Sequence, residues 1–161
     1  VESDIITYNA AVGSCNEGGQ WIMALSLFSV VREVKLEPDI ITFNVAISVC
    51  GAGGQWQRAL SLLTDSSAAN LEPDVITLST AISACEKCEQ WQRALWLLRE
   101  TWEMRLEPNL ICHNAAISAC EKCWQWQHAL SLLSDMQEVN LRPDVVSHNA
   151  GISACEKGEQ W

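Results

Sequence analysis

Hydrophobic residues along this chain recur at the spacing of amphipathic α-helices. One segment carries apolar residues at offsets of 0, 3, 4 and 7, which lie on one face of a helix: Phe43, Ala46, Ile47 and Cys50. A short link containing glycine follows, over residues 51–55. The same offsets then return in a second segment, at Trp56, Ala59, Leu60 and Leu63. The pattern predicts two helices joined by a turn.

The whole pattern repeats with a period of 35 residues. Three series keep this interval: Trp21, Trp56, Trp91, Trp126 and Trp161; Cys15, Cys50, Cys85, Cys120 and Cys155; and Pro38, Pro73, Pro108 and Pro143. Each proline ends a helix, and the Asp or Asn after it can cap the next one. Each unit is therefore an α-hairpin, which must stack on its neighbours to cover its apolar face. We expect an all-α fold, a right-handed superhelical α-solenoid in which inner and outer helices alternate.

The period also gives the expected domain organisation. We predict one solenoid over residues 1–161, with repeats at 5–39, 40–74, 75–109 and 110–144 and a partial repeat at 145–161. We interpret the recurrent tryptophan as a packing contact between hairpins. Because the sequence opens on Val1 and stops at Trp161, where a helix should begin, we expect a piece of a longer protein.

Composition narrows the possible partners. Hydrophobic residues make up 48% of the chain, enough for a folded core. No apolar run is long enough to span a membrane, which takes roughly 18 residues. Acidic residues outnumber basic ones 20 to 10, a net charge of −10 that counts against attraction to nucleic acid, and no DNA partner is expected. Five of the 8 cysteines hold one place in the repeat, which favours buried thiols in a reducing compartment.

The repeat resembles the pentatricopeptide repeat family. The resemblance rests on the period of 35, a first helix reading Ile-Ile-Thr-Phe-Asn (40–44), a second reading Trp-Gln-Arg-Ala-Leu-Ser-Leu-Leu (56–63) and the Pro-Asp end. Tetratricopeptide repeats have a period of about 34 and a Trp-x-x-Leu-Gly-x-x-Tyr pattern that is absent here. The resemblance implies an organellar protein, of the chloroplast or mitochondrion, that binds single-stranded RNA with one base per repeat.

By the same resemblance, two positions per repeat read the base. The fifth residue of the first helix faces the base edge, and the last residue of the repeat orients it. The pairs are Asn9 with Asp39, Asn44 with Asp74, Ser79 with Asn109, and Asn114 with Asp144, followed by Asn149. In the family, Asn with Asp suggests uracil and Ser with Asn suggests adenine, which implies a U-U-A-U target. The alternative is that these residues only cap helices and bond between repeats.

The resemblance also implies residues that sandwich the bases and residues that contact phosphate. The second residue of each first helix would sandwich a base: Ile6, Ile41, Ile76, Ile111 and Val146. A lysine near the end of the first helix would contact phosphate: Lys87, Lys122 and Lys157. The first two repeats depart from this pattern, with Glu17 and Ala52 at that place.

We expect neither a metal site nor an enzyme. The pairs Cys85-x-x-Cys88 and Cys120-x-x-Cys123 are spaced like a zinc ribbon. However, stacked helices lie about 8–10 Å apart, too far for four sulfurs to reach one ion. We interpret His113 and His148 as packing residues, because they stand where other repeats carry Tyr, Phe or Leu. No nucleophile is paired with a base by the repeat, and no cofactor is expected.

Three tryptophans lie outside the repeat pattern and suggest a contact surface: Trp96, Trp102 and Trp124. Two functions therefore remain. The first is a sequence-selective, non-catalytic module that binds single-stranded RNA in an organellar RNA-processing or stabilising factor. The alternative is a scaffold or accessory subunit that contacts protein subunits of a large organellar assembly, such as a ribosome or a membrane-associated energy-converting complex. The acidic balance and the three tryptophans favour the alternative.

Overall fold

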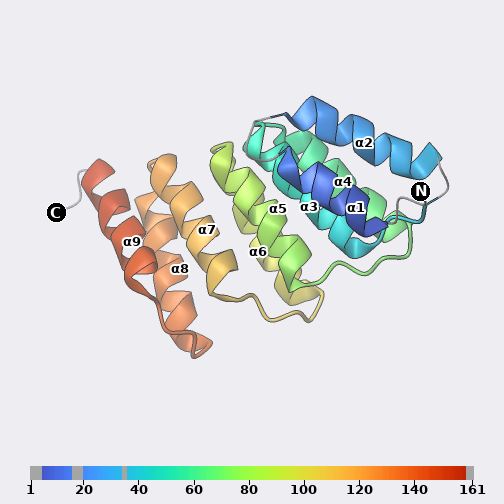
Figure 1. The fold of residues 1–161 in the computed structure, drawn as a ribbon. Coiled ribbons are helices and arrows are strands. Elements are labelled where there is room, and N and C mark those ends of the chain that lie inside the picture. The colour runs from blue at the N-terminus through green and yellow to red at the C-terminus, as the bar shows by residue number, and fades with distance from the viewer. Residues whose placement is uncertain (1–4, 16–19, 34–35, 159–161) are drawn as a thin grey trace.

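The computed structural model describes residues 5–15, 20–33 and 36–158, and this part of the chain is a stack of helices (Figure 1). Four hairpins come first, and a further first helix follows. The helices are α1 (Ile5–Ser14), α2 (Trp21–Glu33), α3 (Ile40–Ala52), α4 (Trp56–Ala68), α5 (Val75–Lys87), α6 (Trp91–Glu103), α7 (Leu110–Lys122), α8 (Trp126–Glu138) and α9 (Val145–Lys157). Trp161 and Glu17 lie outside the described residues. None of the described helices is both long and apolar enough to cross a membrane.

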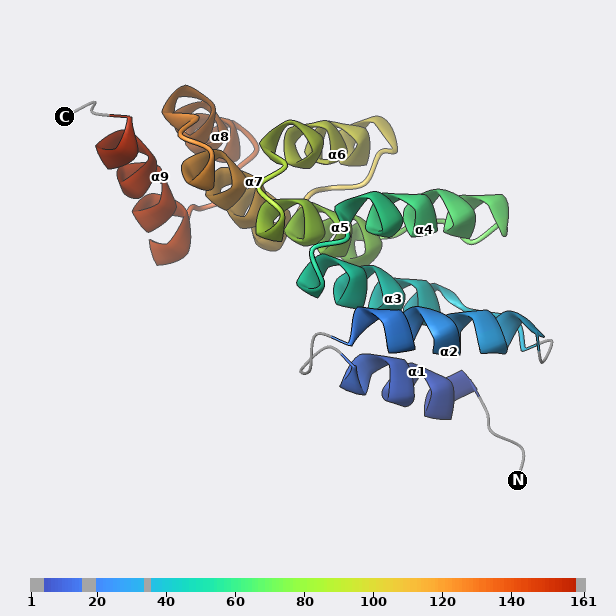
Figure 2. The same cartoon turned by 90° about the horizontal axis from the view of Figure 1, so that it is seen from above.

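The helices form two layers. Each first helix packs on the next, α1 on α3, α3 on α5, α5 on α7 and α7 on α9. Each second helix instead packs on its own first helix and on the first helix that follows, and in the described part of the chain no two second helices pack on each other. The first helices are therefore the closely spaced inner row. Figures 1 and 2 show successive hairpins turned relative to one another, and the expected α-solenoid is confirmed.

The core forms where the periodic apolar residues meet. The cysteine series is fully buried at Cys50, Cys85 and Cys120, together with the isoleucines of the same helices, Ile47, Ile82 and Ile117. On α9 the counterpart Ile152 is 61% exposed, because no described element covers that face. Burying one such side chain contributes about 1.5–3 kcal/mol. Stability therefore comes from contacts between consecutive hairpins.

The Asp or Asn after each proline caps the following first helix, as expected. The side chains of Asp39, Asp74, Asn109 and Asp144 each accept a hydrogen bond from the backbone N–H three residues later. A cap of this kind stabilises a helix by about 1 kcal/mol. These four residues therefore fix where each inner helix begins.

The recurrent tryptophan packs against the end of the next first helix. A Cβ on Gly53 would lie 2.3 Å from the Trp21 ring, and one on Gly158 would lie 2.3 Å from the Trp126 ring. Arg58 lies over Trp21, with its guanidinium carbon 5.3 Å from the ring centroid. The His128 ring lies against that of Trp91 at a tilt of 50°, with the ring centroids 5.0 Å apart. Trp21, Trp91 and Trp126 thus each contact the following hairpin, in agreement with the predicted packing role.

Candidate functional site

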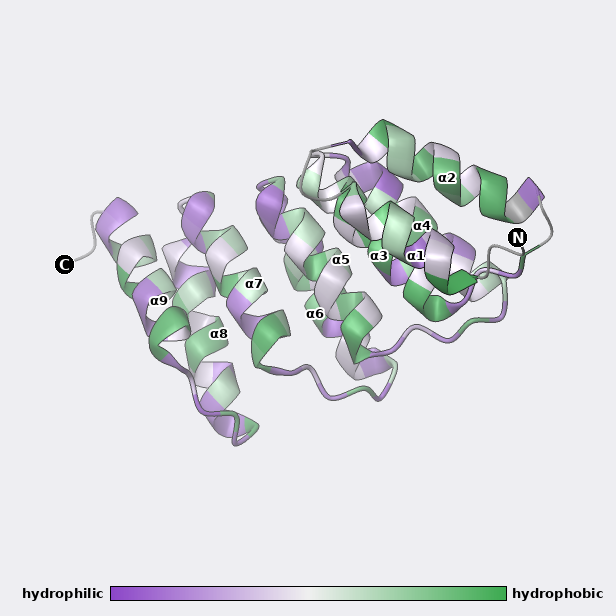
Figure 3. Cartoon of the chain, viewed as in Figure 1, coloured by the Kyte–Doolittle hydropathy of each residue, from purple (hydrophilic) through white to green (hydrophobic). Residues whose placement is uncertain are grey.

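A row of exposed aliphatic side chains runs along the inner helices. It consists of the second residues of α1, α3, α5, α7 and α9, which are between 57% and 72% exposed: Ile6, Ile41, Ile76, Ile111 and Val146. Figure 3 shows the corresponding hydrophobic stretches at the beginning of α5 and α7. Aliphatic side chains repeated at equal steps on one row offer flat apolar faces to a ligand that has the same repeat.

The proposed reading pairs meet in two of the hairpins. Asn9 Nδ2 donates to Asp39 Oδ1 at 3.5 Å, and Asn114 Nδ2 donates to Asp144 Oδ1 at 3.2 Å. Burial alone would raise the pKa of Asp39, but hydrogen bonds from Thr42 and Asn9 together lower it. The carboxylates of these pairs are therefore ionised at neutral pH, and they orient the amides while they cap the next helix.

The four positions of the reading series are not equivalent. The Asn44 Oδ1 atom is buried and accepts no hydrogen bond, and the same holds for Asn9 Oδ1. Ser79 is only 6% exposed, and its hydroxyl donates to the Ile76 carbonyl oxygen at 2.9 Å. Asn149, by contrast, is exposed on α9. Residues of this series therefore do cap helices and form hydrogen bonds between helices within the chain. The amide oxygens of Asn9 and Asn44 still have no hydrogen-bond partner.

A hollow of about 300 Å³ lies on the inner row, between α3, α5 and α7. We name it the first-helix hollow, and its lining residues are Ser48, Ile76, Ser79, Thr80, Ser83, Ala84, Lys87 and Ile111. It brings together two residues expected to sandwich a base, one expected to read it and one expected to hold phosphate. The lining thus combines two aliphatic walls, several hydroxyl groups and one ammonium group.

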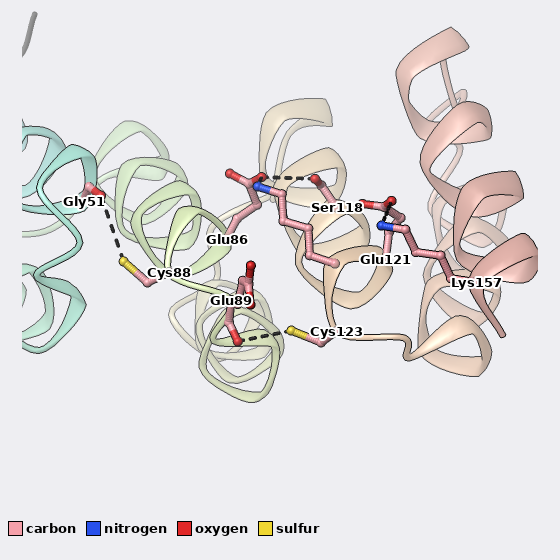
Figure 4. A network of polar contacts seen from close by, with 9 residues as sticks. Gly51, Glu86, Cys88, Glu89, Ser118, Glu121, Cys123 and Lys157 are labelled. Atoms are coloured by element: carbon pink, nitrogen blue, oxygen red, sulfur yellow. Dashed lines mark hydrogen bonds and ion pairs between the residues drawn. The ribbon is translucent and has the colours of Figure 1, made fainter.

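The three lysines expected to contact phosphate have different surroundings. Lys122 Nζ lies 2.5 Å from Glu86 Oε1, and Lys157 Nζ lies 2.6 Å from Glu121 Oε1 (Figure 4). Burial alone would raise the pKa of Glu121, but hydrogen bonds from Lys157 and Ser153 and the charges of Lys157 and Lys122 lower it. Lys122 and Lys157 are therefore partly neutralised within the chain, a pairing that the sequence analysis missed. Lys87 forms no ion pair with any described residue.

The three tryptophans outside the repeat pattern lie on two different elements. Trp96 and Trp102 are partly exposed on α6, and Trp124 is 63% exposed in the link before α8. Trp102 lies near the end of its second helix, whereas Trp124 lies just before the beginning of the next one. The two indoles are thus at opposite ends of the hairpins, at least about 15 Å apart along the helix axis.

Cys88, Cys123 and His113 have packing partners, whereas His148 does not lie in the core. Cys88 Sγ lies 4.0 Å from the Gly51 carbonyl oxygen, and Cys123 Sγ lies 3.1 Å from that of Glu89, one hairpin further along (Figure 4). Among the described residues, no three His, Cys, Asp or Glu side chains are placed to hold one metal ion. His113 is buried, as predicted, and its Nδ1 lies 3.1 Å from the Asn109 carbonyl oxygen. His148 is exposed instead, because no described element covers α9 there.

Comparison with protein families gives two matches. Residues 1–53 and 61–122 match the pentatricopeptide repeat domain, and residues 108–157 match the PPR repeat family. Comparison with curated protein sequences finds no match.

Solved structures resemble the described fold over nearly all of the chain. The pentatricopeptide repeat protein PPR10 in complex with an 18-nucleotide psaJ RNA element is 28% identical, with a TM-score of 0.88 over 98% of this chain and 23% of that one. The chain thus spans about a quarter of that protein. The PPR domain of Arabidopsis thaliana protein-only RNase P 1 in complex with tRNA is 14% identical, with a TM-score of 0.77 over 93% of this chain and 79% of that one. At that identity the second likeness shows the fold alone.

Proposed function

Because the chain belongs to the pentatricopeptide repeat family, we propose that its inner helices bind single-stranded RNA and read one base per repeat. The module is sequence-selective and non-catalytic, and it is part of an organellar factor that processes or stabilises RNA. The observation that carries this proposal is the first-helix hollow, because residues with three different expected roles line it together.

The hollow suits a nucleobase in shape and chemistry. Ile76 and Ile111 come from consecutive inner helices, so a flat ring between them contacts an aliphatic side chain on each face. The Ser79 hydroxyl already donates its proton to the Ile76 carbonyl, so its free lone pairs can accept a hydrogen bond from a base. Lys87 provides the positive charge that a strand of phosphates requires.

The reading pairs supply selectivity in this proposal. The Asn114 amide is oriented within the chain, because its Nδ2 donates to Asp144 and its Oδ1 accepts from the Ser147 hydroxyl. By the family's pattern, the Asn and Asp pairs select uracil, and Ser79 with Asn109 selects adenine. The expected target is therefore U-U-A-U, with Asn149 reading a further base.

The structural relatives support an RNA partner. The PPR10 complex contains an RNA element, and its identity of 28% is high enough to suggest more than a shared fold. Since this chain spans about a quarter of that protein, four or five bases are the expected length of the contact, one per first helix. The organellar setting and the absence of catalysis are parts of the same proposal.

An exchange at the third reading position tests the proposal. Ser79→Asn combined with Asn109→Asp gives this hairpin the pair found in its neighbours. Both new residues fit the fold, because Asn44 and Asn114 occupy the first position elsewhere and Asp caps α3, α5 and α9. Fluorescence anisotropy at low salt should show preference moving from U-U-A-U to U-U-U-U by about 10- to 100-fold, the discrimination of roughly 1–3 kcal/mol typical of a base-edge contact.

The matched control is Asp65→Asn on the exposed face of α4, which should leave the preference unchanged. If neither RNA binds at low salt, or if the exchange leaves the preference unmoved, the RNA-binding proposal fails. In that case, a scaffold that contacts protein subunits becomes the better explanation of what this chain does.

A further inference from the structure

Two consecutive junctions between inner helices contain the same three-residue cluster. Between α5 and α7, Glu86 Oε1 accepts from Ser118 Oγ at 3.1 Å and pairs with Lys122 Nζ at 2.5 Å. The next junction, between α7 and α9, repeats this arrangement, with Glu121 Oε1 lying 2.8 Å from Ser153 Oγ. The same oxygen lies 2.6 Å from Lys157 Nζ (Figure 4). In both clusters one carboxylate satisfies a hydroxyl and an ammonium group, four residues apart on the following helix.

The junction between α3 and α5 has the same two donors but no carboxylate. Ser83 and Lys87 hold the positions of Ser118 and Lys122, and Gly51 stands where Glu86 would be. A Cβ on Gly51 would lie 2.6 Å from Ala84 Cβ and 2.7 Å from its Cα, so the close approach of α3 and α5 leaves no room for a side chain. The Ser83 hydroxyl makes no hydrogen bond and Lys87 no ion pair with the described residues, and both line the first-helix hollow.

The other two junctions indicate which ligand suits this one. There, the hydroxyl and the ammonium group are satisfied together by an oxyanion on a side chain that is only 17% or 15% exposed. The α3–α5 junction offers the same donors to an oxyanion that must come from outside the chain. A phosphate oxygen has the matching charge and accepting capacity.

We propose that Glu86 and Glu121 close the lysine positions of the α5–α7 and α7–α9 junctions to the RNA strand, so that the strand is held at the α3–α5 junction, where Ser83 and Lys87 have no such carboxylate. This inference rests on the proposed function and adds where the strand is gripped. The two glutamates thereby determine where along the inner row the RNA strand is held. A phosphate that reaches Lys122 or Lys157 must displace a carboxylate, which is also negatively charged. In this acidic chain, with its net charge of −10, Lys87 thus places a positive charge without a carboxylate partner among the described residues beside a base-sized hollow.

The test compares salt dependence in matched variants. For single-stranded RNA, the slope of log affinity against log salt changes by about 0.7 for each phosphate contact. Glu86→Gln with Glu121→Gln should free Lys122 and Lys157 and steepen the slope by about 1.4. The control pair, Glu107→Gln with Glu138→Gln, changes the net charge equally at exposed positions off the inner row and should have a much smaller effect. Lys87→Ala should flatten the slope by about 0.7 and lower affinity at low salt by about tenfold or more.

Two results would overturn the inference while the RNA proposal stands. One is that Lys87→Ala leaves the slope unchanged although the Ser79 exchange still moves base preference, and the other is that the glutamate variant matches its control. Inorganic phosphate is titrated separately and followed by the amide resonances of residues 83–87. If these amide resonances shift with phosphate but none of the variants binds RNA, the site binds free phosphate and not RNA. Both proposals then fail. Loss of the phosphate response in Ser83→Ala and Lys87→Ala, together with the expected slopes, supports the inference.

Discussion

Trp124 occupies a backbone conformation that rarely suits a large side chain. Its φ is +63°, in the left-handed region, and the equivalent link positions are Gly54 at +73° and Glu89 at +57°. A residue with a Cβ in this region is destabilised by roughly 1–2 kcal/mol relative to the right-handed region. The indole is 63% exposed, so packing offsets only part of this cost.

Replacing Trp124 with glycine should therefore stabilise the protein. Removal of the strain contributes about 1–2 kcal/mol, and the greater freedom of glycine in the unfolded chain costs about 0.5–1 kcal/mol. The net gain is then on the order of 0.5–1 kcal/mol, which for a chain of this size raises Tm by about 1–4 °C. Trp124→Ala removes the same indole but keeps the Cβ, so it should give no such gain.

Calorimetry of the Gly and Ala variants, with hydrogen exchange of residues 120–126, measures the effect and its location. Exchange should slow mainly around the α7–α8 link in the glycine variant. If both variants lower Tm equally, the indole stabilises the hairpin and the strain argument is wrong. If the glycine variant is more stable but no longer binds a partner of the protein, the Trp124 side chain contributes to binding and lowers stability.

Three further changes have defined outcomes. Asp74→Ala removes the cap of α5 and should lower the free energy of unfolding by about 1 kcal/mol in urea titration, whereas Asp65→Ala on the exposed face of α4 should have little effect. Burial lowers the pKa of His113, so as pH falls the unfolded chain binds a proton at this residue before the folded chain does. The stability that comes from burying neutral His113 is therefore full above about pH 6.5 and is lost as pH falls through the folded pKa. His113→Leu should remove that slope in Tm measured from pH 5 to 7. Chelators should leave Tm unchanged, and a fall that disappears in Cys88→Gly with Cys123→Gly would reveal a metal site.

The sequence was sufficient to predict the helices and the layers. Apolar residues at helical spacing and a gapless period fix the faces that must be buried, so Cys50, Ile82 and His113 lie where the pattern put them. The caps followed as well, because Asp and Asn are preferred N-cap residues and proline ends the preceding helix. These features depend on neighbours within one unit or on the equivalence of units.

The ion pairs could not be predicted in the same way. Glu86 and Lys122 belong to different units, and their contact depends on the distance and rotation between two helices, which the period alone does not set. A signal was nevertheless present, because Glu-Lys recurs at 86–87, 121–122 and 156–157, whereas Gly51 and Ala52 replace it earlier. The burial of Ser79 was missed for a related reason, since its exposure depends on how closely α5 approaches its neighbours.

The contact of each tryptophan with the following hairpin limits how this gene segment can change. Every unit carries the same two halves of the contact, an indole such as Trp21 and a small residue such as Gly53 or Cys88. Unequal crossing-over in register therefore joins compatible surfaces at every breakpoint and changes the number of repeats by whole units. A shift of one residue would instead place Ala52 where Gly53 lies against the Trp21 ring, and a Cβ at Gly53 already comes within 2.3 Å of that ring. Contacts of this kind at the junctions thus favour changes that keep the 35-residue length of each unit.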